Sequence, residues 1–187
     1  ADANKKICKS VNDVVVCDSK GILHEGRAGL DGYKEELVGM TNRDGVEGTL
    51  EDALKGADVF IGVSVANALP SGMITLMAKD PVVFAMANPV PEVMPDVARK
   101  AGAKVVATGR SDFPNQVNNA LAYPGVFRGA LDHRIPRITM RMKLAAAHAL
   151  ASLVERPMPE MIMPSIFDKR VVKVVSKAVG AEADGGS

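Results

Sequence analysis

Two continuous apolar runs, Val82–Met86 and Val105–Thr108, end abruptly in polar loops, and this feature most constrains the fold. Neither run alternates apolar with polar residues, so each is expected to be a strand buried on both faces, as in parallel sheets. A third apolar run, Val59–Val65, precedes them, and helix-like segments separate all three. The alternation predicts an α/β fold with a parallel sheet and helices on both faces.

Local signals place the helices around these runs. Thr49 and Asp52 have the spacing of a capping box, which predicts a helix that Gly56 ends. The apolar residues of the segment 138–154 lie on a single stripe, which is typical of an amphipathic helix. We also expect the end of a helix over residues 1–12, one domain over residues 1–187, and a C-terminal helical extension of it over residues 137–187.

Composition excludes several classes of protein. The 23 basic and 22 acidic residues are mixed along the 187-residue chain and leave a net charge of +1, so no basic stripe for nucleic acid is present. Residues 59–78 carry no charge, but Asn67 and Pro70 interrupt them, so we expect no membrane span. Two cysteines, Cys8 and Cys17, are too few for a disulfide framework, which favours a reducing, cytoplasmic compartment.

Asparagines follow both Val82–Met86 and Val105–Thr108. Asn88 follows the first run, and Asn118 and Asn119 follow the second. In open parallel sheets, ligands bind beyond the carboxyl ends of the strands. Carboxamides at two neighbouring strand ends can orient a hydroxy acid and a nicotinamide amide without adding charge. Two structural alternatives remain, because Asn88-Pro89 can form a turn and Asn118 and Asn119 can cap a helix.

Asp18 follows the β-branched run Val14–Val16 and precedes a turn at 19–21. Strand, acid and turn form the pattern of the second strand of a Rossmann-like fold, where the carboxylate accepts hydrogen bonds from a ribose hydroxyl. The alternative is that Asp18 only begins the turn. No Gly-x-Gly-x-x-Gly fingerprint is present, so we expect the first strand and the glycine-rich loop to precede residue 1 in a longer protein.

The sequence resembles the C-terminal, dinucleotide-binding part of the malic enzymes in their smaller bacterial form. The resemblance implies a Rossmann-like fold and the oxidative decarboxylation of L-malate to pyruvate and CO₂, with NAD or NADP as cofactor and Mg or Mn as metal. The matching segments, in chain order, are DVVVCDSKGIL, TLEDALKGADVFIGVS, PVVFAMANPVPE, VVATGRSDFPNQVNNALAYPGVFRGAL and IMPSIFD.

The resemblance also implies roles for the asparagines. By position, Asn88 corresponds to the asparagine of the family that contacts malate and the nicotinamide. Asn119, with Asn118 beside it, corresponds to the pair that closes the same pocket. L-malate is therefore the substrate that the resemblance implies for these three residues.

The same resemblance implies a cofactor site. Gly62, Val63 and Ser64 correspond to the strand-end segment that runs past the cofactor, and Asp18 corresponds to a residue near the adenine ribose. Because a carboxylate near the ribose repels a 2′-phosphate, Asp18 favours NAD over NADP.

Other parts of a malic enzyme are not matched by this chain. The resemblance implies that the general-acid tyrosine, the catalytic lysine and three acidic ligands of the Mg or Mn ion lie before residue 1. We therefore expect the chain by itself to be inactive and to work with the missing N-terminal domain, in a homodimer or larger assembly. Two alternatives are another NAD-dependent hydroxy-acid or amino-acid dehydrogenase and a non-catalytic nucleotide-sensing module.

Overall fold

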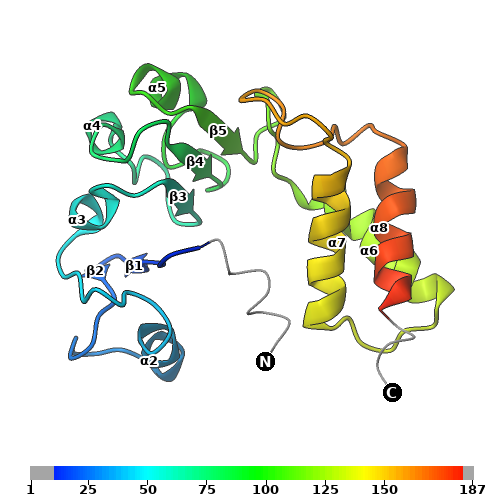
Figure 1. Ribbon diagram of the computed structural model, residues 1–187, viewed down its shortest axis with the longest axis horizontal. Coiled ribbons are helices and arrows are strands. Elements are labelled where there is room, and N and C mark those ends of the chain that lie inside the picture. The colour runs from blue at the N-terminus through cyan, green and yellow to red at the C-terminus, as the bar shows by residue number, and fades with distance from the viewer. Residues whose placement is uncertain (1–10, 183–187) are drawn as a thin grey trace.

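The computed structural model describes residues 11–182 and is drawn in Figure 1. All but the last two residues of the helix end expected over residues 1–12 lie outside this range. Among the helices within residues 11–182, none has the length and apolar character that crossing a membrane requires. The elements are β1 (Cys17–Asp18), β2 (Gly21–Ile22), α2 (Gly32–Val38), α3 (Leu50–Leu54), β3 (Val59–Gly62), α4 (Ser71–Ile74), β4 (Val82–Ala85), α5 (Pro95–Lys100), β5 (Val105–Thr108), α6 (Asn119–Asp132), α7 (Met140–Ser152) and α8 (Arg170–Ala181).

The main sheet has three parallel strands in the order β3-β4-β5. Val59 pairs with Val82 and Val82 with Val105, so the strands begin in register. Each strand begins at the first residue of one of the three apolar runs, and the prediction of an α/β fold with a parallel sheet is confirmed. The register brings the carboxyl ends of all three strands to one level.

One face of this sheet is covered by α3, α4 and α5, which lie along the same side of the strands in Figure 1. Leu54 of α3, Ile74 of α4 and Ala98 of α5 are buried in one apolar cluster with side chains of the strands. The opposite face is open at β3, where Val59 and Ile61 are 48% and 63% exposed. Within residues 11–182, the expected cover on both faces is therefore incomplete.

The expected strand over Val14–Val16 is wrong in its position and its pairing. Strand β1 begins only at Cys17 and pairs antiparallel with β2, so the two form a small hairpin outside the parallel sheet. The backbone oxygens of this segment accept hydrogen bonds from two separate parts of the chain. The N–H of Leu23 donates to the oxygen of Val16, and the N–H of Asn42 donates to the oxygen of Val14, each at 2.8 Å. Scattered partners of this kind do not make a ladder.

The C-terminal helices α6, α7 and α8 form a second apolar cluster, which lies beside the sheet region in Figure 1. Helix α6 runs through Pro124 without ending there. A Cβ atom at Gly125 would lie 2.6 Å from Cβ of Val175, so this glycine allows α8 to lie directly against α6. Helix α6 contributes Leu121 and Val126 to this cluster.

Candidate functional site

Most of the predicted site residues lie at one edge of the sheet. Gly62, Ala85 and Thr108 are paired in register at the ends of β3, β4 and β5. The loops of residues 63–70, 86–94 and 109–118 therefore leave from this edge, which we call the carboxyl edge. Ligands of open parallel sheets bind at such an edge. Of the predicted residues, it holds Gly62, Val63, Ser64, Asn88, Asn118 and Asn119.

The three asparagines differ in their surroundings. Asn88 and Asn119 are exposed, and within residues 11–182 no hydrogen bond involves either side chain. Asn118 is the N-cap of α6, and its Oδ1 accepts a hydrogen bond of 2.9 Å from the N–H of Ala120. The N–H of Val117 donates to the oxygen of Thr108 over 2.8 Å, which returns the chain to the end of β5 just before Asn118. The capping alternative therefore holds for Asn118, while the amides of Asn88 and Asn119 are free to bind a ligand.

A buried glutamate that sequence analysis did not single out joins two of these loops. Glu92 is 0% exposed, and its Oε1 accepts hydrogen bonds from the N–H and the hydroxyl of Ser64 at 2.7 and 3.1 Å. Its Oε2 accepts from the N–H of Ala87 at 3.0 Å, directly before Asn88. The sequence does carry a signal for this residue, because Glu92 is a lone carboxylate in the otherwise apolar stretch from Pro91 to Pro95.

The charge of Glu92 is stabilised by backbone dipoles. Among residues 11–182 it is the one charged side chain in the buried core, and it forms no ion pair there. Burial raises the pKa of the Glu92 carboxyl, but the N–H groups of Ser64 and Ala87 outweigh this effect and hold its pKa below the ordinary value. A Cβ atom at Gly62 would lie 2.5 Å from Cδ of Glu92, so this carboxylate needs glycine at the end of β3.

Asp18 belongs to the β1–β2 hairpin and is not part of the carboxyl edge. Its Oδ2 accepts a hydrogen bond from Lys34 at 2.8 Å, and its Oδ1 accepts one from Arg27 at 2.5 Å. These two partners, together with the N–H of Lys20, hold the pKa of the Asp18 carboxyl well below its usual range. The three paired side chains thus carry one positive charge in sum, a feature that the sequence analysis did not anticipate.

Asn115 has a structural role. It is 5% exposed, and its Nδ2 donates to the carbonyl oxygens of Val106 at 3.1 Å and Pro159 at 2.7 Å. Its Oδ1 accepts from the N–H of Ile162 at 2.8 Å. One side chain therefore joins β5 to the connector between α7 and α8.

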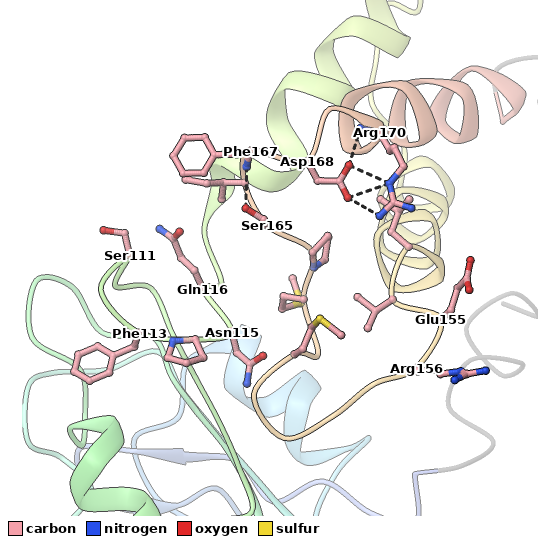
Figure 2. Close-up of a pocket in the computed structure, with 17 residues that line it drawn as sticks. Ser111, Phe113, Asn115, Gln116, Glu155, Arg156, Ser165, Phe167, Asp168 and Arg170 are labelled. Carbon is pink, nitrogen blue, oxygen red and sulfur yellow. Dashed lines mark hydrogen bonds and ion pairs between the residues drawn. The ribbon is translucent and has the colours of Figure 1, made fainter.

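A cavity of about 700 Å³ opens beside Asn115, between the loop after β5 and that connector (Figure 2). Gln116 lies on one side, and Asp168 and Arg170 lie on the other, where they form an ion pair of 2.7 Å. None of Asn88, Asn118 and Asn119 lines this cavity.

The groups that gather at the carboxyl edge are uncharged amides. The uncharged amides at the carboxyl edge suit a nicotinamide and a hydroxy acid, and a buried glutamate orders two of the strand-end loops there. By contrast, the described part of the chain contains no group of three or more His, Cys, Asp or Glu side chains that could hold a metal ion.

Comparison with known proteins identifies the family. The family model described as "Malic enzyme, NAD binding domain" matches residues 3–183. The chain belongs to the malic enzyme family. The sequence resemblance to malic enzymes is thereby confirmed over nearly the whole chain.

Two curated malic enzymes and a solved structure of a third illustrate the relationship. The bifunctional malic/malolactic enzyme of Bacillus subtilis is 56% identical over 92% of this chain and 43% of its own length. The NAD-dependent malic enzyme of Geobacillus stearothermophilus is 46% identical over 92% of this chain and 36% of its own length. The crystal structure of the NAD-dependent malic enzyme of Thermotoga maritima superposes with a TM-score of 0.88 and 48% identity, over 95% of this chain and 47% of that one. The chain thus spans less than half the length of these malic enzymes.

Proposed function

We propose that the full-length protein that contains this chain oxidises L-malate with NAD or NADP and decarboxylates it to pyruvate and CO₂. Membership of the malic enzyme family over residues 3–183 is the observation that carries the proposal. The parallel sheet, whose three strands end at one level, supports it further, because dinucleotides bind at such an edge.

The contribution of this chain is to bind the cofactor and to orient malate against it. When bound, NAD(P) accepts a hydride from the hydroxyl-bearing carbon of malate. We assign the orientation of malate against the nicotinamide to Asn88 and Asn119, whose exposed amides follow adjacent strands and have no partner within residues 11–182. A carboxamide can donate to the substrate carboxylate or hydroxyl and accept from the nicotinamide amide, and fixing this geometry lowers the barrier. Asn118 supports this arrangement as the N-cap that begins α6.

The segment Gly62–Ser64 completes the proposed cofactor site. Gly62 ends β3 without a side chain, so the cofactor can approach the backbone there, and Val63 is exposed at the same edge. We assign Mg or Mn to residues outside this chain, because the resemblance to malic enzymes places the three acidic ligands before residue 1, and we derive no step through the metal.

Cofactor preference depends on Asp18. The sequence favours NAD because this carboxylate repels a 2′-phosphate. Because Lys34 and Arg27 both bond to the carboxylate, that repulsion is partly neutralised, and both cations are within reach of a ligand at Asp18. NAD remains our prediction, with NADP as the alternative that these cations favour.

The test is an assay of the full-length protein with L-malate, Mn²⁺ and either NAD or NADP. We expect equal amounts of reduced cofactor and pyruvate. Reduction without pyruvate would indicate a hydroxy-acid dehydrogenase that does not decarboxylate. Binding of the nucleotide without any reduction would indicate the nucleotide-sensing module.

A further inference from the structure

The fully buried carboxylate of Glu92 needs an explanation. Removing a charged group from water costs several kcal/mol unless it is paired or hydrogen-bonded. Within residues 11–182 no lysine, arginine or histidine forms an ion pair with Glu92, and its charge is held by donors from Ser64 and Ala87 together with its own backbone N–H. An apolar residue would fill the same space without this cost, so stability alone gives a poor account of the carboxylate.

The donors identify what Glu92 holds in place. Ser64 lies just beyond the end of β3, and Ala87 lies beyond the end of β4 and directly before Asn88. The contact is reinforced by the main chain, because the N–H of Leu69 donates to the oxygen of Glu92 at 3.0 Å. The N–H of Asn67 likewise donates to the oxygen of Pro91 at 3.1 Å, so main-chain bonds join the outer parts of the two loops. The Glu92 side chain adds the contacts nearest the strand ends, at Ser64 and Ala87, beside the proposed cofactor and substrate contacts.

We propose that Glu92 is a positioning residue, which acts through Asn88 by holding its loop against the Ser64 segment at the geometry needed for hydride transfer. The inference rests on the proposed function. Glu92 itself does not touch the substrate, because its carboxylate is fully buried and occupied by its three donors. Its effect on catalysis therefore passes through the amide that follows Ala87.

The substitution Glu92→Gln tests this with little change in volume. A glutamine has one accepting oxygen, so its NH₂ group must face the N–H of either Ser64 or Ala87, and one of these two contacts beside the strand ends is lost. Misplacement of a reacting group by about 1 Å can cost about a hundredfold in rate. In the full-length protein we expect kcat/KM for malate to fall by about tenfold to a hundredfold.

A double-mutant cycle with Asn88→Ala separates positioning from general stability. In the Asn88→Ala background we expect Glu92→Gln to lower kcat/KM by less than about threefold, since the group it positions is gone. Losses that multiply independently would overturn the proposal, as would a fully active Glu92→Gln variant. Glu160→Gln is the matched control, because Glu160 is exposed and its ion pair with Arg99 lies at the surface, and the activity of this variant should be unchanged.

Two further results keep the test decisive. If Glu92→Gln does not fold, Glu92→Asp replaces it, because aspartate keeps the charge but is too short to reach both Ser64 and Ala87. The same loss and the same dependence on Asn88 are expected, and their absence overturns the proposal. If the unsubstituted full-length protein does not oxidise malate, the proposed function fails, which is distinct from a cycle in which the two substitutions act independently.

Discussion

The Nδ2 atom of Asn115 donates a hydrogen bond of 2.7 Å to the carbonyl oxygen of Pro159, a residue 44 positions further along the chain. The same side chain bonds to Val106 in β5 and to Ile162 in the connector. Asn115 therefore links the sheet, which carries the proposed cofactor site, to the loop that joins α7 to α8. Its φ of 57° lies in the left-handed region, which asparagine tolerates better than most residues.

Replacement of Asn115 by alanine should destabilise the full-length protein. The change removes three hydrogen bonds, leaves two carbonyl oxygens and one N–H without a partner, and puts alanine at a positive φ. We expect the free energy of unfolding, measured in urea, to fall by about 3 kcal/mol. Asn88→Ala is the control, because Asn88 is exposed without a hydrogen bond, and it should change by less than about 0.5 kcal/mol. Equal effects of the two substitutions would contradict the role of Asn115.

The sequence predicted the elements whose signals are local. Strands β4 and β5 were predicted from apolar runs, since such runs need cover on both faces. The start of α3 was predicted because Thr49 and Asp52 form the capping box that their spacing indicates. The long helix begins at Met140 and not at residue 138, because Thr139 caps it through the N–H of Met142.

The sequence could not predict features that depend on partners far along the chain. Val14–Val16 has the composition of a strand, but its oxygens bond to Leu23 and Asn42, and composition does not reveal such partners. The buried role of Glu92 depends on the loop at Ser64, 28 residues earlier. The pairing of Asp18 with two cations likewise needed the fold, since Lys34 lies 16 residues away.

Gly62 should not tolerate alanine. The added Cβ would lie 2.5 Å from Cδ of Glu92 and 2.8 Å from the ring of Phe60, so the carboxylate must leave its donors. We expect Gly62→Ala to lower the free energy of unfolding by about 2 kcal/mol and to weaken NAD(P) binding, measured by calorimetry.

Gly72→Ala is the matched control for that substitution. Gly72 lies in α4, where an added Cβ would have no heavy atom within 4 Å, and alanine favours a helix by about 0.5–1 kcal/mol over glycine. Its stability should be equal or slightly higher. A Gly62→Ala protein as stable as Gly72→Ala, with unchanged cofactor affinity, would show that Glu92 does not need the space.

Asp18→Asn should shift cofactor preference toward NADP. The substitution removes the negative charge and leaves Arg27 and Lys34 available to a 2′-phosphate, which both side chains bind well. We expect the ratio of kcat/KM for NADP to that for NAD to rise by about tenfold. Asp132→Asn, which breaks an exposed ion pair with Arg128 on α6, should leave the ratio unchanged. An unchanged ratio in Asp18→Asn would place the ribose elsewhere.

The 187-residue chain by itself should not turn over malate. The resemblance to malic enzymes assigns the acid–base pair and the metal ligands to residues outside it, and residues 11–182 contain no metal-binding group of their own. The purified chain, assayed with L-malate, Mn²⁺ and NAD, is expected to give no reduced cofactor above background. Turnover by the chain alone would mean that the catalytic groups lie within it.

The most direct test of the substrate site is the activity of Asn88→Ala in the full-length protein, at saturating NAD and Mn²⁺. If the exposed amide after β4 orients malate, kcat/KM for malate should fall by about a hundredfold or more, while the thermal unfolding midpoint stays within about 1 °C of the unsubstituted protein. A variant that oxidises malate as fast as the unsubstituted protein would contradict the assignment of the substrate site to the carboxyl edge.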